Sequence, residues 1–304
     1  KLLCFDRDGK FLKKFEARGN GPDEYFMLCF LAADPVSKKI LVADDVVRKI
    51  FIFDEFLNLE HVVKVDFTPK QVIAFRDDMI LRYENDNKEQ YQDSLLRDYD
   101  LHWIDLKGDV VQGMIRNRTP KYGLSFLSAS GYLDNGDILY YPTLGDTVYR
   151  VAVSERTVSP AYIIESGDED VKLLNDEQRR EMDPNAELPE YEKRNYFFPV
   201  EFFNVGSHIL LRSGMDDMYL YSKNSGNAIR YDKTLENMSG DRTFDYLTSI
   251  IYACDGDWCY GPHHAITLQY MAKDYGFSGK YKAMIDSMET DANLFLACFK
   301  VKDF

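Results

Sequence analysis

Two adjacent histidines are the first residues in this sequence that could do chemistry. His263 and His264 stand in the segment Y-G-P-H-H-A, directly after a predicted strand. An imidazole could act as a general base or as a metal ligand. Adjacent side chains on extended backbone point to opposite faces, so these two rings are poorly placed to bind one metal ion together. The alternative is that a histidine caps a helix, because residues 265–275 have a helical pattern.

Acidic residues at the ends of predicted strands form a second group of candidates, because carboxylate oxygens are the ligands that calcium prefers. They are Asp44-Asp45, Asp77-Asp78, Asp216-Asp217 and the D-G-D segment at 255–257. None has the EF-hand spacing, and aspartate at a strand end is also ordinary turn chemistry. We therefore predict no cofactor, with calcium or another divalent metal as the alternative, and we assign no metal ligand.

The sequence lacks the three catalytic motifs G-x-S-x-G, H-E-x-x-H and G-x-x-x-x-G-K-[ST]. No catalytic residue is predicted, and a protein that is not an enzyme is the favoured interpretation.

Residues 17–25 read A-R-G-N-G-P-D-E-Y, which is typical of a tight connection between strands. We expect Gly19 and Gly21 to adopt positive φ and Pro22 to stiffen the turn. Glu24 could accept hydrogen bonds from nearby backbone N–H groups, and Tyr25 could pack its ring between sheets.

Arg18 precedes this connection, and it could meet an anionic group or pair with Glu24. A structural role for the segment is favoured over ligand binding.

The composition limits the possible partners. The chain has 304 residues and a formal net charge of −14, which argues against binding nucleic acid or anionic lipid. No run of 18 apolar residues occurs, so we predict no transmembrane segment.

The five cysteines, Cys4, Cys29, Cys254, Cys259 and Cys298, are interpreted as buried thiols. A disulfide between Cys254 and Cys259 is the alternative.

Short apolar segments separated by turns recur along the whole chain. They include a hairpin around the D-G turn at residues 8–9 and three strands in residues 39–65, where Ile50 and Ile52 alternate with Phe51 and Phe53. Repeats of four short strands in about 40–50 residues indicate a β-propeller. Helical patterns at 168–195 and 265–290 are interpreted as inserts on a rim or face.

The repeats form six sets, and the first of them is incomplete. We therefore predict an all-β, six-bladed propeller as a single domain over residues 1–304. We expect the strand at 293–301 to pair with the N-terminal strands and so to close the ring. Because Lys1 begins within a hairpin pattern, we also expect the natural chain to have residues upstream.

The segments F5-D-R-D-G-K-F11 and G19-N-G-P-D-E-Y25 resemble motifs of a six-bladed propeller family common in Bacteroidetes, which is related to NHL-repeat propellers. Asp23 stands where that family usually has glycine. The resemblance implies a cell-envelope or periplasmic protein, often a predicted lipoprotein that is anchored by lipid.

The favoured function is a non-catalytic binding or scaffold propeller for a small molecule, carbohydrate, peptide or protein. The alternative is a metal-dependent lyase or hydrolase with its site in the central channel. A ligand site is expected on the face that carries the crossover loops, formed by Arg18, Glu24, Tyr25 and His263 or His264.

Overall fold

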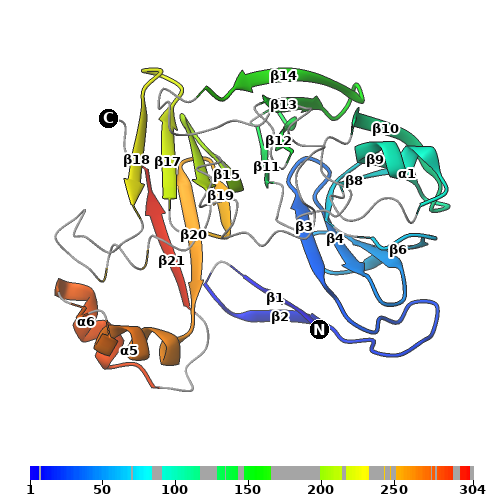
Figure 1. The fold of residues 1–304 in the computed structure, drawn as a ribbon. Helices are drawn as coiled ribbons and strands as arrows, with labels where there is room; N and C mark the ends of the chain where they lie inside the picture. Colours follow the sequence, from blue (N-terminus) through cyan, green and yellow to red (C-terminus); the bar gives the residue numbers. More distant parts are fainter. Residues whose placement is uncertain are drawn as a thin grey trace.

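The computed structural model describes residues 1–6, 8–69, 71–83, 91–116, 129–133, 135–142, 147–165, 199–213, 217–232, 243, 247, 251–274, 276–277, 279–289 and 295–301. Most of these residues are β-strand, and the strands form separate antiparallel sheets that follow one another around a ring in chain order (Figure 1). This is a mostly β, propeller arrangement.

The first half of the chain forms a two-stranded hairpin and two four-stranded sheets. The hairpin contains β1 (Leu2–Phe5) and β2 (Phe11–Phe15). The next sheet contains β3 (Phe30–Asp34), β4 (Lys39–Asp44), β5 (Lys49–Phe53) and β6 (Leu59–Lys64). The sheet after it contains β7 (Val72–Arg76), β8 (Met79–Tyr83), β9 (Tyr99–Asp105) and β10 (Val110–Arg116).

The second half forms two four-stranded sheets and a three-stranded one. The first contains β11 (Ala129–Tyr132), β12 (Ile138–Tyr141), β13 (Thr147–Ala152) and β14 (Thr157–Ile163). The second contains β15 (Pro199–Val205), β16 (His208–Ser213), β17 (Asp217–Ser222) and β18 (Ala228–Asp232). The last contains β19 (Ala253–Asp255), β20 (Trp258–His263) and β21 (Phe295–Lys300).

The core consists of hydrophobic layers between consecutive sheets. Strand β5 shows why, because Ile50 and Ile52 pack toward the β7–β10 sheet while Phe51 and Phe53 pack toward the β1–β2 hairpin. Each of these four side chains is completely buried. The predicted alternation on β5 is therefore confirmed, and it follows from a sheet that is covered on both faces.

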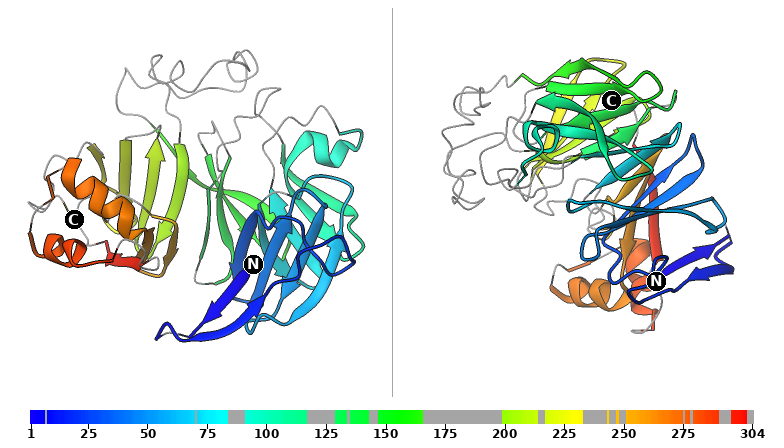
Figure 2. Two further views of the ribbon diagram at one scale, coloured as in Figure 1. Left: turned by 90° about the horizontal axis from the view of Figure 1, so that it is seen from below. Right: turned by 90° about the vertical axis from the view of Figure 1, so that its right-hand side faces the viewer.

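Three helices accompany the strands in the described part of the chain: α1 (Ser94–Asp98), α5 (Ala265–Asp274) and α6 (Gly279–Asp286). Helices α5 and α6 lie beside the last sheet (Figure 2). Their apolar side chains pack against Phe295 and Ala297 of β21. The helical prediction for 265–290 is confirmed, whereas the helix predicted in 168–195 lies outside the described residues. None of the described helices has both the length and the apolar character needed to cross a membrane.

The predicted pairing of residues 293–301 with the N-terminal strands is wrong. Strand β21 pairs with β20, from Trp258 opposite Lys300 to His263 opposite Phe295. Strands β1 and β2 pair with each other and form a sheet of their own. Helices α5 and α6 follow β20 and return the chain to it, so β21 forms beside β20. Phe295 and Ala297 of β21 then pack against the two helices.

Candidate functional site

The connection from β2 to β3 is closed by its own backbone. The Tyr25 N–H donates to the Ala17 carbonyl at 2.9 Å, and the Gly19 N–H donates to the Tyr25 carbonyl at 2.9 Å. Arg18 and Tyr25 therefore lie side by side as an isolated parallel bridge. Residues 19–24 form a loop between these two points.

Glu24 folds back over this loop and accepts the Gly21 N–H at 2.7 Å. A Cβ atom at position 19 would lie 2.0 Å from Glu24 Oε2, and one at position 21 would lie 3.0 Å from it. Neither glycine is among the residues with positive φ, so the prediction of positive φ at Gly19 and Gly21 is wrong. The glycines instead leave room for the carboxylate. Glu24 accepts a hydrogen bond from a backbone N–H group, as predicted.

Lys49, at the start of β5, holds the same loop from below. Its ammonium donates to the carbonyl oxygens of Gly21, Pro22 and Glu24 at 2.5, 3.0 and 2.9 Å. Hydrogen bonds from a charged donor are the stronger kind, so the loop is fixed to the neighbouring sheet.

Asp44 fixes the next part of the connection. It is completely buried, and its Oδ2 accepts the N–H groups of Phe26 and Met27 at 2.6 and 2.9 Å. Its Oδ1 accepts the N–H groups of Val46 and Val47 in the turn after β4. Asp44 and Lys49 face each other across β4 and β5, so one strand pair anchors the whole connection.

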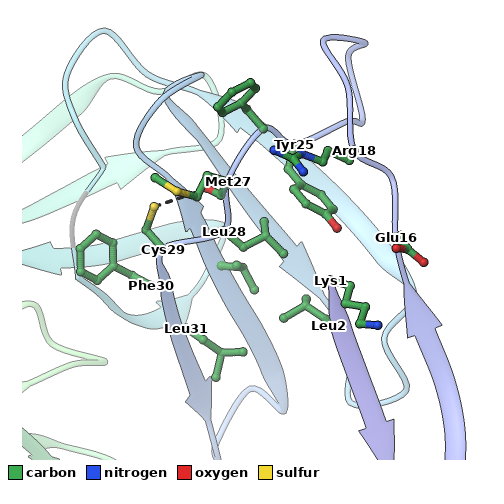
Figure 3. Close-up of a pocket in the computed structure, with 12 residues that line it drawn as sticks. Lys1, Leu2, Glu16, Arg18, Tyr25, Met27, Leu28, Cys29, Phe30 and Leu31 are labelled. Carbon is green, nitrogen blue, oxygen red and sulfur yellow. Dashed lines mark hydrogen bonds between the residues drawn. The ribbon is translucent and has the colours of Figure 1, made fainter.

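A pocket of about 460 Å³ opens between this connection, the β1–β2 hairpin and the start of β3 (Figure 3). Its lining mixes charged rim residues with apolar walls: Lys1, Leu2, Glu16, Arg18, Tyr25, Phe26, Met27, Leu28, Cys29, Phe30, Leu31 and Val42. Pockets that bind small molecules commonly combine apolar walls with a few polar groups in this way.

Tyr25 forms one wall of the pocket and is only 4% exposed. Its ring packs 5.8 Å from that of Phe15, within the layer between the hairpin and the β3–β6 sheet. The predicted packing of Tyr25 between sheets is thereby confirmed, and the wall it supplies is rigid because the ring is held on both sides.

Two charged side chains at the rim, Arg18 and Glu16, have different surroundings. Arg18 is exposed, and its guanidinium lies 5.6 Å from the ring centre of Phe26. Glu16 is paired with Lys14 at 2.5 Å, and the hydrogen bond and charge of Lys14 lower the pKa of Glu16. On the floor, Cys29 Sγ donates to Asp45 Oδ1 at 2.9 Å, and burial together with this bond raises the pKa of the thiol to about 11.

The two histidines lie away from this pocket. His263 is 4% exposed, its Nε2 donates to the Leu247 carbonyl at 3.1 Å, and its ring stacks on Phe295 at 6.0 Å. Burial lowers the pKa of His263. His264 is exposed, and its carbonyl accepts the Leu268 N–H at the start of α5. The structure thus brings Arg18 and Tyr25 together at the pocket, while Glu24, His263 and His264 are not among its lining residues.

The acidic candidates are used in several ways. Asp44 binds backbone as described, Asp77 and Asp78 form the positive-φ turn between β7 and β8, and Asp257 lies 3.8 Å from the Lys300 ammonium. Within the described ranges, no three His, Cys, Asp or Glu side chains are grouped as metal ligands. Asp216 lies outside those ranges.

One residue that shapes this region, Lys49, was missed in the sequence, and Asp44 was considered only as a possible calcium ligand. Both lie about twenty residues after the motif, at adjacent strand ends, and the order of the sheets was needed to bring them to it. The only available signal was the D-x-x-x-x-K spacing across the β4–β5 turn, which also suits an ordinary solvent-exposed turn.

Several solved structures are similar to this chain in fold. A Bacteroides fragilis protein that is described as a predicted exported protein matches with a TM-score of 0.70 and 16% identity, covering 98% of this chain and 84% of the other. A member of the DUF4221 family from Bacteroides vulgatus matches with a TM-score of 0.46 and 11% identity, over 76% and 74% of the two chains. At such identities the likeness concerns the fold alone.

The sequence comparisons give two further findings. No protein of curated function matches the chain. A family described as "Domain of unknown function (DUF4934)" matches residues 1–300, which is nearly the whole chain. The chain therefore belongs to the DUF4934 family.

Proposed function

We propose that this protein is a non-catalytic binding propeller of the bacterial cell envelope and that its ligand occupies the pocket beside the β2–β3 connection. The envelope location is supported by the Bacteroides protein of similar fold, whose description predicts export. The resemblance of residues 19–25 to propellers that are often predicted lipoproteins points to the same compartment.

The observation that carries the proposal is the pocket itself. Its volume of about 460 Å³ suits a small ligand or the end of a larger chain. The connection that forms it is held by hydrogen bonds of Glu24, Lys49 and Asp44 within the protein, so its shape does not depend on contacts with a ligand. A preformed site loses less entropy when it binds.

The lining indicates the chemistry of the ligand. Leu2, Leu28 and Leu31 offer apolar contact, while Arg18 offers an exposed guanidinium at the rim. A guanidinium matches the geometry of a carboxylate, with two parallel hydrogen bonds. The ligand we propose therefore has an apolar body and a carboxylate, as a short peptide with an apolar C-terminus does.

Calorimetric titration tests this proposal with pairs of short apolar peptides that end in either a free carboxylate or an amide. The free-carboxylate peptides should bind, and Arg18→Gln should weaken that binding about tenfold, which corresponds to about 1.4 kcal/mol. Arg97→Gln is the matched control, because Arg97 is an exposed arginine paired with Asp98 on α1.

A second variant blocks the apolar wall. Leu31 is 62% exposed, so Leu31→Asp should fold normally and still abolish binding. Equal peptide affinity in the wild type, Arg18→Gln and Leu31→Asp would show that the pocket is not the site. Neutral oligosaccharides titrated in parallel distinguish a carbohydrate ligand from a peptide.

The remaining predicted site residues take a supporting part in this proposal. Glu24 shapes the loop beneath Arg18, and His263 and His264 would act only if a ligand extended to the last sheet. The enzyme alternative predicts a bound metal, so elemental analysis of the purified protein tests it directly.

We also infer that the ring has six blades. The β1–β2 hairpin is a separate sheet next to the complete β3–β6 blade, and four further sheets follow it. In this interpretation the hairpin is part of an incomplete first blade. An electron density map of the crystallised protein, with its sheets counted around the axis, tests the number.

A further inference from the structure

Two cysteine thiols face each other in the last sheet. Cys254 of β19 lies directly opposite Cys259 of β20, and their Sγ atoms are 3.5 Å apart. Both are free thiols in this structure. A disulfide bond is about 2.05 Å long, so a movement of about 1.5 Å would join the two atoms.

The hairpin itself creates this juxtaposition. Asp255 and Trp258 pair across a two-residue turn in which Gly256 has a φ of 53°. The next pair along the ladder is Cys254 and Cys259. Residues that are directly opposite in an antiparallel pair have their Cα atoms about 4.5–5.5 Å apart, within the range that a disulfide spans.

The two thiols differ in access and in acidity. Cys259 is completely buried, whereas Cys254 is half-buried and can be reached from solvent. The hydrogen bond that Cys254 donates to Cys259 lowers the pKa of Cys259, and the same bond together with burial raises the pKa of Cys254. The pair thus has an accessible sulfur and, behind it, a sulfur that favours the thiolate.

The other cysteines have different surroundings. Cys298 is exposed, so the prediction that it is a buried thiol is wrong, and it points to the opposite face from Cys259. Cys29 donates to Asp45, and Cys4 packs in the layer beneath the hairpin. Of the five thiols, all within the described residues, Cys254 and Cys259 are the two that form a hydrogen bond with each other.

We propose that Cys254 and Cys259 are a redox-active pair that forms a reversible disulfide with an oxidant of the glutathione-disulfide class. Cys254 gives up its proton along its hydrogen bond to Cys259 and attacks one sulfur of the oxidant, which forms a mixed disulfide, and the glutathione thiolate that leaves takes up this proton. The Cys259 thiolate then attacks Cys254 Sγ, forms the protein disulfide and releases the second glutathione. The protein loses two protons and two electrons, and the electrons reduce one glutathione disulfide to two thiols.

The bond would act locally. It closes a loop of only a few residues, and the entropy removed from the unfolded chain by a short loop is small. Its effect would be to fix β19, which has three residues and is the shortest strand of the described chain, to β20. A disulfide that adds little stability is easily reduced again, so we expect the pair to be reversible.

The test uses the purified chain in mixtures of reduced and oxidised glutathione, followed by alkylation of free thiols and mass mapping of the peptides. We expect oxidation to remove two hydrogen atoms and to protect both Cys254 and Cys259, while Cys4, Cys29 and Cys298 remain alkylated. Excess reduced glutathione should restore all five alkylation sites.

Variants separate the two steps. Cys259→Ser should stop at a glutathione adduct on Cys254, and Cys254→Ser should form little adduct because Cys259 is buried. Cys298→Ser is the control and should behave as the wild type does. The same reaction in urea should lose its preference for this pair, because that preference comes from the folded hairpin.

The proposal is wrong if both cysteines remain open to alkylation in fully oxidised glutathione while the fold is intact by circular dichroism. It is equally wrong if the disulfide links another pair, or if both single variants accumulate adduct equally. Mapping of the wild type decides the matter even where a serine variant folds poorly.

Discussion

The β2–β3 connection and the chain around His263 were both candidates for binding, and the structure uses their polar groups in different ways. In the β2–β3 connection, backbone groups of the loop are satisfied by Glu24, Lys49 and Asp44, and Arg18 stays at the surface beside a pocket. Around His263, the polar side chain itself is buried and bonded to Leu247.

The difference shows what makes a polar residue available to a ligand. A buried polar group has to find a partner within the protein, because leaving it unsatisfied costs about 1–3 kcal/mol. A buried group that already has such a partner is not available to a ligand, and His263 is an example. In the β2–β3 connection Glu24, Lys49 and Asp44 bind the backbone. The Arg18 side chain is exposed at the pocket and is accessible to a ligand.

Among the substitutions in these two regions, Asp44→Ala should cause the largest loss of stability. Asp44 accepts four backbone N–H groups and is completely buried, so its loss should lower the free energy of unfolding by about 3 kcal/mol. Asp105→Ala is the matched control, because Asp105 binds the N–H groups of Lys107 and Asp109 in an exposed turn. Urea unfolding measures both, and equal losses would show that Asp44 does not anchor the connection.

Lys49→Met should cause the second largest loss of stability. The variant keeps the apolar part of the side chain and removes an ammonium that binds three carbonyl oxygens, so we expect a loss of about 2 kcal/mol. Lys64 lies opposite Lys49 on β6 and is exposed, which makes Lys64→Met the control with a loss below about 0.5 kcal/mol. If Lys49→Met loses no more stability than Lys64→Met, Lys49 does not anchor the loop.

Gly19→Ala should destabilise by about 1 kcal/mol, because the new methyl group displaces the Glu24 carboxylate from the Gly21 N–H. Glu24→Ala should cost a similar amount for the same reason. In a double-mutant cycle the two losses should therefore overlap instead of adding. Additive losses would mean that the glycine serves something other than Glu24.

The smallest effect concerns pH. Burial lowers the pKa of His263 below its ordinary value of 6.5, so the unfolded chain binds a proton that the folded chain resists. Stability is then full above about pH 6.5 and falls as the pH decreases toward the folded pKa. Melting temperatures measured across this range should decrease by a few degrees at most.

His263→Gln removes this titration and keeps a donor for the Leu247 carbonyl, so it should flatten the dependence. His264→Gln is the control, because that side chain is exposed. A slope that persists in His263→Gln would assign the pH dependence to another group.

Local patterns predicted the elements well. The hairpin around Gly9, the alternation on β5 and the helices at 265–274 and 279–286 all follow from residues that are close in sequence. Strands β3, β7 and β15, with the sequences F-L-A-A-D, V-I-A-F-R and P-V-E-F-F-N-V, were not predicted, although turn residues follow each of them.

Arg18 and Tyr25 line the pocket, and their part in binding a ligand stays a prediction. Glu24 turns into the loop, and the glycines are explained by the space it needs. The Glu24 geometry was within reach of the sequence in principle, because a carboxylate three residues after a glycine N–H is a common turn partner. Its steric demand on position 19 was not, because it depends on the path of the loop.

The sequence by itself determined that strands would form, where the motif loop would turn and which residues would alternate between two buried faces, because these depend on periods of two residues and on local turn chemistry. Only the tertiary structure decided that β21 pairs with β20, that Asp44 and Lys49 hold the motif loop, and that His263 is used within the core. Those contacts join residues that are distant along the chain. Their partners are selected by the order in which whole sheets pack, and no local pattern records that order.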